Sequence, residues 1–441
     1  MHAASGKANR KLPDTASALR RGQNDRGLAM SQPSAADAAP SGGRDARIIA
    51  LIGTGHFLSH FYMLCLPPLF LAWRTEFEVS YATLGLSVAL MSATTAALQT
   101  PVGFWVDRYG ARPFLIGGTL IMALSISAMA LAPSFWVILP LAVLSGVGNS
   151  VIHPADYAIL AGSATKSFMG RAFALHTFTG NLGFALAPPV IALLLTLMDW
   201  RGALLTVGLV GVPVVAAILL QSRVLQDQAK PKPAEAGPAG RELLLSRPML
   251  LFFAFFLLSS MAGSGIQAWL VTVLGKLWGT PVLAASAALT GYMVGATSGT
   301  LVGGWIADKA KGGLLGMVMA LTAAAMALLL IPGLLPLPEA VLPVVTGLAG
   351  LALGTSRAPR DVMLKDACPP GQMGKVFGFV SSSLPLGSAI VPVPMGFLID
   401  MGYPWLVLPV VAGLLGLSLL CAGGARGSSR RQPAAGVVAA E

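Results

Sequence analysis

Twelve long apolar runs follow one another along this sequence, and they limit its fold more than any other feature. From residue 47 onward, runs of about 20 apolar residues alternate with short polar breaks. An α-helix rises about 1.5 Å per residue, so each run is long enough to cross about 30 Å of hydrocarbon. The expected spans are 47–72, 83–106, 113–132, 135–161, 172–197, 202–222, 248–275, 284–306, 314–332, 340–366, 375–399 and 405–423.

The composition excludes the main alternatives to a helical membrane protein. Only 11% of the residues are charged and the mean hydropathy is +0.74, whereas soluble domains carry about a quarter charged residues and disordered chains are polar. The strands of a membrane barrel would alternate in hydrophobicity, and these runs do not. The expected fold class is therefore an all-α membrane protein, with twelve transmembrane helices in two six-helix bundles.

The basic residues predict the orientation in the membrane. The net charge is +11, and if the N-terminus is cytoplasmic, all but three of the 29 Lys and Arg residues lie on the cytoplasmic side. The exceptions are Arg74, Arg201 and Lys276. Cytoplasmic loops are enriched in Lys and Arg, so topology explains the basic excess and no nucleic-acid partner is expected. We expect a multi-pass protein of a bacterial-type inner (plasma) membrane, surrounded by lipid, with both termini cytoplasmic.

The longest internal break divides the chain into two halves, and it is rich in Pro, Ala and charged residues, which indicates a flexible linker. The expected organisation is a disordered cytoplasmic tail (1–46), an N-terminal six-helix bundle (47–222), a cytoplasmic linker (223–247), a C-terminal six-helix bundle (248–423) and a second cytoplasmic tail (424–441).

The two halves resemble each other in residues that are uncommon inside membranes. Gly103-Phe-Trp-Val-Asp107-Arg108 recurs as Gly304-Trp-Ile-Ala-Asp308-Lys309, and Met169-Gly-Arg-Ala-Phe173 recurs as Met373-Gly-Lys-Val-Phe377. Repeats in the same orientation, six spans apart, indicate two bundles related by an axis along the membrane normal.

The first copy resembles the cytoplasmic signature of the major facilitator superfamily. It reads Gly103-x-x-x-Asp107-Arg108-x-Gly110-x-Arg112 between the second and third spans, and the Gly304–Lys309 segment stands where that fold places its second copy. The resemblance implies a secondary transporter with alternating access. We interpret the loop as a conformational latch, in which Asp107 holds a basic side chain or a helix end and the glycines allow close helix approach. The expected latch residues are Gly103, Asp107, Arg108, Gly110, Arg112, Gly304, Asp308 and Lys309.

Three further segments look like the fosmidomycin-resistance group of drug exporters within that superfamily. They are Gly55-His56-Phe-Leu-Ser59-His60, Gly148-Asn149-Ser-Val-Ile-His153-Pro154 and Gly180-Asn181-Leu-Gly183. The chain departs from that group at Ser59-His60, where the group carries Asn-Asp. It also lacks the Arg of many proton antiporters in the fourth span, where Ala142 stands, so proton coupling would use other residues.

Ionisable residues within the spans supply the candidates for transport chemistry, because charge inside a membrane is costly and usually functional. His56 and His60 are four residues apart and share one helix face. We favour His60 as the proton-linked group, since Asp156 and Asp361 each have a basic neighbour that favours the ionised carboxylate. His153–Asp156 and Arg360–Asp361 occupy equivalent turns, and they either pair across the bundles or anchor helix ends. The candidate substrate or proton pathway comprises His56, His60, Asn149, His153, Asp156, His176, Asn181, Arg360 and Asp361.

The expected function is secondary active transport of a small organic compound, with proton-coupled efflux of an amphiphilic or anionic compound as the first choice. Uptake of an organic acid or nutrient, and a non-transporting receptor or scaffold, are the alternatives. No enzyme is expected, because the segment ending in Lys166-Ser167 lacks the glycine of a phosphate loop. Cys65, Cys368 and Cys421 are too far apart for a metal-ligand spacing, so no metal site is expected. No cofactor and no obligate protein partner are expected either.

The charge bias leads to a test of topology. Reporter domains fused after residues 30, 235 and 435 are all expected to report a cytoplasmic location, because the basic residues around these positions stay inside. A periplasmic signal from the fusion at 235 would contradict the division into six and six spans.

Overall fold

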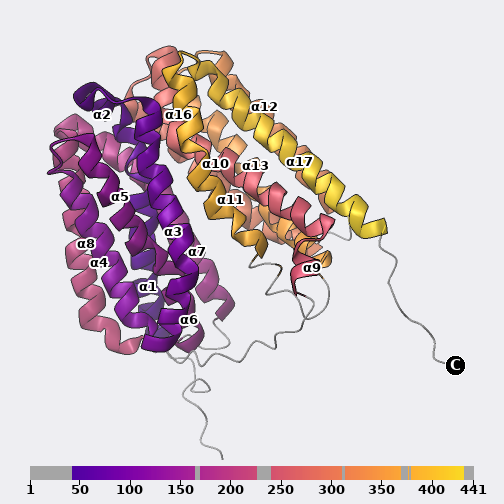
Figure 1. The fold of residues 1–441 in the computed structure, drawn as a ribbon, viewed down its shortest axis with the longest axis horizontal. Coiled ribbons are helices and arrows are strands. Elements are labelled where there is room, and N and C mark those ends of the chain that lie inside the picture. The colour runs from indigo at the N-terminus through magenta and orange to yellow at the C-terminus, as the bar shows by residue number, and fades with distance from the viewer. Residues whose placement is uncertain are drawn as a thin grey trace, which may run out of the picture.

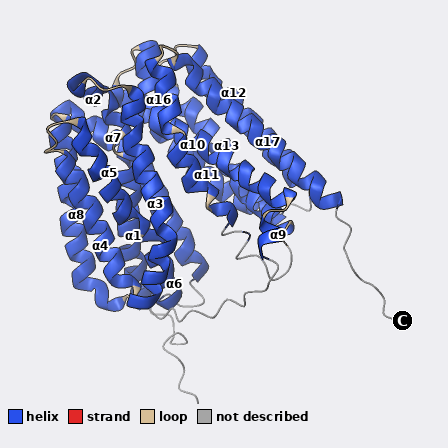
Figure 2. Cartoon of the chain, viewed as in Figure 1, coloured by secondary structure: helices blue, strands red, loops and turns tan. Residues whose placement is uncertain are grey.

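A computed structural model of the chain describes residues 42–163, 169–225, 240–309, 313–368, 376 and 379–431. Within these residues the regular elements are helices and there are no strands, which confirms the expected fold class (Figure 2). The first half contains α1 (Gly42–Leu64), η2 (Pro67–Leu69), α2 (Phe70–Phe77), α3 (Tyr81–Tyr109), α4 (Ala111–Met129), α5 (Phe135–Ser150), α6 (Ile152–Ser163), α7 (Met169–Leu197), α8 (Trp200–Gln221) and η3 (Ser222–Val224).

The second half contains α9 (Gly240–Leu244), α10 (Arg247–Trp278), α11 (Val282–Lys309), α12 (Leu314–Leu334), α13 (Leu342–Asp366), α15 (Ser383–Ile390), α16 (Pro392–Asp400), η4 (Pro404–Leu406) and α17 (Val407–Arg431). Each of the twelve expected spans therefore overlaps a helix or a pair of consecutive helices. Residues 1–41, 226–239 and 432–441, which contain most of the expected tails and linker, lie outside the described residues.

The two halves of the chain form two bundles. In Figure 1 the indigo-to-magenta bundle and the pink-to-yellow bundle meet at the upper end and separate toward the lower end, where α17 finishes. The contacts between the bundles are made mainly by α3 with α15 and α16, and by α7 with α11. The bundles separate on the side where α1 begins and α17 ends.

Two expected spans are broken by proline. Pro154 has no N–H to donate to the carbonyl of Ser150, and there α5 ends and α6 begins. Likewise α15 ends at Ile390 and α16 begins at Pro392, whereas α7 continues through Pro188 and Pro189. The first break matters for function, because it places His153 and Asp156 in the first turns of a new helix.

Helices α11 and α13 pack backbone against backbone, which the sequence interpretation did not anticipate. Gly291, Gly295, Gly299 and Gly303 recur every four residues and therefore form one stripe along α11. A Cβ added at Gly295 or Gly303 would lie 2.9 Å from a backbone carbonyl carbon of α13, closer than real Cβ atoms come. Within the described residues, ten helical segments satisfy a strict length and hydropathy criterion for a membrane span, and α11 and α13 are not among them. Their small or charged residues lower the hydropathy but allow this close contact.

The signature loop has a different geometry from the one expected. Gly110 joins α3 to α4 at φ 88°, a left-handed conformation that favours glycine. Gly103 and Gly304 have no described atom within 4 Å of an added Cβ, so the expectation that these two glycines allow close helix approach is wrong for this conformation. Arg108 lies over the ring of Tyr109, 5.2 Å from its centroid. The side chains of Asp107, Asp308 and Lys309 lie outside the described residues.

A carboxylate connects the bundles at their upper end. Asp400, the last residue of α16, accepts hydrogen bonds from the backbone N–H groups of Tyr81 (2.7 Å) and Ala82 (2.8 Å) at the start of α3. These N–H groups have no partner inside their own helix, and the helix dipole favours an anion there. The C-terminal bundle thus caps a helix of the N-terminal bundle, on the side opposite the chain ends.

We expect Asp400→Ala to weaken this closure and to raise the population of molecules that are open on the upper side. The measurement is the distance distribution between spin labels on Leu131→Cys and Glu339→Cys, which lie in upper loops of the two bundles, in a chain with Cys65, Cys368 and Cys421 replaced.

Asp199→Ala is the matched control, because Asp199 caps α8 through the N–H of Gly202 (2.8 Å) within the N-terminal bundle. The control should destabilise its helix without changing the label distances. Unchanged distances in Asp400→Ala would show that the cap does not hold the bundles together.

Candidate functional site

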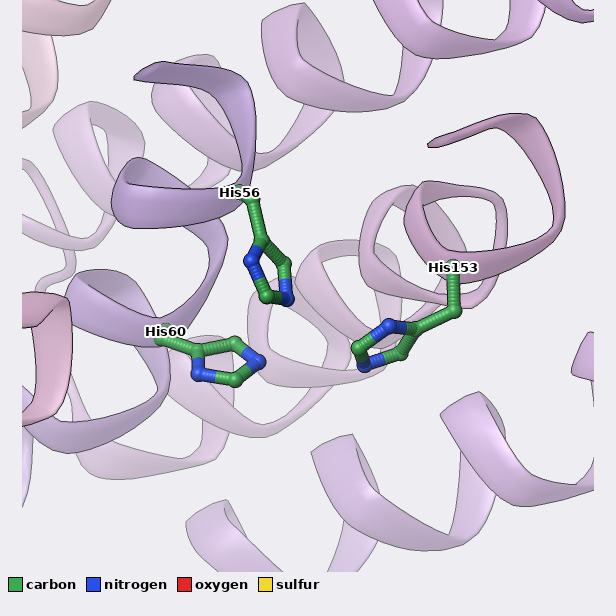
Figure 3. A group of neighbouring side chains, drawn as sticks. All are labelled: His56, His60 and His153. Atoms are coloured by element: carbon green, nitrogen blue, oxygen red, sulfur yellow. The ribbon is translucent and has the colours of Figure 1, made fainter. Parts of the chain in front are cut away.

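Four histidines that are far apart in the sequence gather inside the N-terminal bundle. His56 and His60 come from α1, His153 from α6 and His176 from α7. The ring of His56 stacks on that of His176 with centroids 3.7 Å apart, and it lies 4.3 Å from His60 and 5.1 Å from His153. Figure 3 shows the rings of His56, His60 and His153 turned toward one another. We call these four residues the histidine cluster.

Asp156 belongs to the same group. Its Oδ2 atom lies 2.9 Å from Nε2 of His176, and His56 Nδ1 lies 2.8 Å from the carbonyl oxygen of His176. His56 and His176 are each 2% exposed and Asp156 is fully buried. A buried carboxylate needs such a partner, because an unpaired charge inside the bundle is costly.

Small residues of α7 create the room for the rings. A Cβ added at Gly180 would approach the ring of His60, 2.7 Å from Nδ1 and 2.8 Å from Cε1, and would also collide with His56. One at Gly183 would lie 3.0 Å from the backbone nitrogen of Phe61. The Gly180-Asn181-Leu-Gly183 segment therefore lets α7 lie directly on α1, and this contact forms the cluster.

The C-terminal bundle contains a cavity of about 290 Å³. The cavity is lined by residues of α10, α11, α12, α13, α15 and α17, and many of the lining side chains are polar. The hydroxyl groups of Ser259, Ser260, Ser264, Ser356 and Ser388, the amide of Gln267 and the guanidinium groups of Arg357 and Arg360 line it.

The two arginines differ in their partners. Arg360 forms an ion pair with Asp361 at 3.0 Å and lies 3.9 Å above the ring of Phe256. Arg357 has no hydrogen-bond or ion-pair partner among the described residues. Since a guanidinium stays charged at any relevant pH, the cavity holds a cation whose charge the described protein does not pair.

A smaller space of about 30 Å³ lies where the bundles meet. It is lined by Phe184 and Met63 from one bundle and by Ser264, Gln267 and Ser388 from the other, and these last three also line the large cavity. The ring of Phe184 packs on His60 with centroids 4.3 Å apart. Phe184 therefore contacts both the histidine cluster and this small space.

The remaining candidates lie near these features rather than in them. The amide of Asn149 donates to Thr95 Oγ1 (3.1 Å) and contacts the sulfur of Met63, which ties α5 to α3 and α1. Asn181 lines an apolar space of about 180 Å³ between α7 and α11. Asp156 and Asp361 each pair inside their own bundle, so no pair of these charges connects the bundles in this conformation.

The sequence analysis did not include Arg357 in the candidate pathway. The signal that could have found it is its position one turn before Arg360, on the same face of α13. The serines carry no such signal, because hydroxyls are common between packed membrane helices.

Comparisons with known proteins agree with this architecture. The sequence profile of the Major Facilitator Superfamily matches residues 52–341 and again residues 273–436. The chain is 25% identical to the fosmidomycin resistance protein of Escherichia coli over 387 residues, which are 82% of this chain and 91% of that protein. It is also 28% identical over 218 residues to a multidrug resistance protein B homolog of Mycobacterium tuberculosis, covering 49% of this chain and 38% of that protein.

Solved structures show the same fold. A bacterial homolog of the human lysosomal transporter Spinster, in an inward-facing and occupied conformation, superposes with a TM-score of 0.73 at 15% identity, over 88% of this chain and 97% of that one. The nucleoside transporter NupG (D323A mutant) superposes with a TM-score of 0.70 at 14% identity, over 86% of this chain and 99% of that one. The repeated loop signature, the two six-span bundles and the profile match along the chain all agree, and this protein belongs to the Major Facilitator Superfamily.

Proposed function

We propose that this transporter exports a small organic anion by alternating access and uses the proton gradient as its energy source. The observation that carries the proposal is the unpaired guanidinium of Arg357 in a cavity lined by serine hydroxyls. A guanidinium offers a planar fork of N–H donors that matches a carboxylate, sulfonate or phosphonate. The serine hydroxyls donate to backbone carbonyls in this structure and would have to rotate to donate to the anion. The assignment as a transporter rests on membership of the Major Facilitator Superfamily.

The expected orientation in the membrane indicates which side of the protein is open. If both chain ends are cytoplasmic, the bundles separate toward the cytoplasm and the Asp400 contact closes the periplasmic side. An exporter loads its substrate in such a state. The resistance proteins among the relatives favour efflux over the alternative, uptake of an organic acid.

The position of the cavity supports alternating access of a bound anion to the two sides of the membrane. Its lining residues continue into the small space at the bundle interface, where Phe184 and Met63 face Ser264 and Gln267. When one bundle rocks against the other, these contacts must change, so an anion held by Arg357 would be exposed to each side in turn.

Fosmidomycin is the first compound to test, together with a panel of small carboxylates, sulfonates and phosphonates and of neutral and cationic compounds of similar size. Expression in a susceptible host is expected to raise the fosmidomycin concentration that stops growth. In proteoliposomes, a proton gradient should drive accumulation of the preferred anion, and a protonophore should abolish it. Accumulation that ignores the protonophore would contradict proton coupling, and preferred transport of neutral or cationic compounds would contradict the anion class.

Arg357→Gln is expected to weaken binding of the transported anion by about tenfold to a hundredfold, because a hydrogen bond to a charged group contributes about 1.5–3 kcal/mol. Arg357→Lys should retain part of the affinity, since it keeps the charge but loses the fork. The measurement is the equilibrium dissociation constant of the purified variants in detergent.

Arg247→Gln is the matched control, because it removes the same charge from an exposed position at the start of α10, away from the cavity. This control should bind the anion like the parent chain. Equal affinities for Arg357→Gln and the parent would refute the assignment of the cavity as the anion site.

A further inference from the structure

Three ring nitrogens in the histidine cluster are buried without a protein partner. Nε2 of His56, Nδ1 of His60 and Nδ1 of His153 each lack a hydrogen bond among the described residues. Buried polar atoms are nearly always paired, and leaving one unpaired costs about 1–3 kcal/mol. Nε2 of His56 points toward the rings of His60 and His153, whereas Nδ1 of His60 lies on the side of Gly180 in α7. Nε2 of His60 is the nitrogen that faces the other two rings (Figure 3).

The three rings are arranged so that they can share one ion. His56 and His60 lie one helix turn apart on α1, and His153 faces them from the first turn of α6 (Figure 3). One ligand nitrogen of each ring lies within 4.8 Å of the others. Tetrahedral zinc with Zn–N bonds of about 2.0–2.1 Å needs nitrogens about 3.3 Å apart. Small rotations of the side chains would close the remaining gap.

The surroundings of His56 suit a metal ligand. Its Nδ1 faces a carbonyl oxygen at 2.8 Å, so Nδ1 must carry the proton and Nε2 the free lone pair. Histidines that bind metals usually donate their other ring N–H to a carbonyl or carboxylate in this way, which fixes the tautomer. The carboxylate of Asp156 contacts His176, which stacks on His56. Its negative charge would offset part of the charge of the bound ion.

We propose that His56, His60 and His153 form a binding site for a divalent transition-metal ion, with Zn²⁺ as the best match. Neutral imidazole nitrogens suit Zn²⁺, Cu²⁺ and Ni²⁺, whereas Mg²⁺ and Ca²⁺ prefer oxygen ligands. Three protein ligands leave a fourth position open. His60 and His153 are partly exposed, so an ion can reach the site, while His56 is buried beneath them. This proposal does not depend on the proposed function.

A second set of possible ligands shares His56 and adds Asp156 and His176. There, Nε2 of His176 and Oδ2 of Asp156 already contact each other at 2.9 Å, so an ion would have to break that pair. In the set His56, His60 and His153, no hydrogen bond between two members has to be broken. The geometry therefore favours the triad His56, His60 and His153, with Asp156 and His176 supporting it from behind.

Zinc binding to the intact chain is the first experiment. The purified full-length protein, prepared without a polyhistidine tag and stripped with a chelator, is titrated with Zn²⁺ against a chromophoric zinc indicator. We expect one ion per chain, and a rise in melting temperature with Zn²⁺ but not with Mg²⁺, because a ligand that binds only the folded state stabilises it. Co²⁺ should show the strong visible absorption of tetrahedral coordination. The absence of stoichiometric Zn²⁺ binding, or of the Co²⁺ bands, would overturn the proposal without any variant.

Variants then distinguish the two ligand sets. His60→Gln and His153→Gln are expected to weaken Zn²⁺ binding by more than about a hundredfold and to remove the Co²⁺ bands, since each removes a ligand and loss of a supporting residue alone costs about tenfold to a hundredfold. His176→Gln is the comparison variant: it should weaken Zn²⁺ binding less than loss of a ligand does and should keep the Co²⁺ bands, because all three triad rings stay in place. Retained binding in His60→Gln and His153→Gln, together with its loss in His176→Gln, would refute the triad. Melting curves without metal identify any variant that fails to fold, and the Co²⁺ spectrum of the parent chain remains decisive in that case.

Discussion

A bilayer offers the polypeptide backbone no water, so every N–H and carbonyl group must find its partner inside the protein. The rest of this structure depends on that constraint. It makes each crossing helical, and it makes every break in a helix costly unless a neighbour compensates. At the break before Pro392, the carbonyl of Ser388 loses its helix donor and instead accepts a hydrogen bond from Ser264 Oγ (3.5 Å). At the start of α3, the open N–H groups are satisfied by Asp400 of the other bundle. Polar partners thus stand where the helices begin or end.

The same constraint explains how much of the fold could be predicted from the sequence. Apolar runs, basic loops and the repeat of Gly103–Arg108 at Gly304–Lys309 were sufficient for the fold class and the family. The ends of the helices were harder to predict. For example, α17 continues to Arg431 through polar residues that hydropathy assigns to a tail. The four-residue spacing of the glycines from Gly291 to Gly303 can be seen in the sequence. Their role as a contact surface, however, depends on α13 packing against them. The Asp400 contact joins residues too far apart in the chain for any local pattern to connect.

The candidate sites also have features that the sequence predicted and features that depend on tertiary packing. Helix spacing alone placed His56 and His60 on one face, and the resemblance pointed to the segments that contain His153 and Gly180. That Gly180 makes room for the rings, and that His56 stacks on His176, depends on the close approach of α7 to α1. Arg357 stands out only because Arg360 is paired with Asp361 and Arg357 is not. Arg360 and Asp361 are neighbours in α13, so their pair is visible in the sequence. That no side chain of another described helix pairs with Arg357 is a tertiary property, which the sequence does not show.

The histidine cluster and the arginine cavity lie in different halves of the chain, although those halves are repeats of one another. His153 and Arg360 occupy equivalent turns, yet one turn carries imidazoles and the other guanidinium groups. Duplication has therefore been followed by specialisation, in which each copy kept the scaffold and changed its chemistry. Substitutions that reshape the serine-lined wall touch none of the histidines. Under the proposed function, substitutions in one half would change which compounds are recognised while the ionisable core of the other half stays the same.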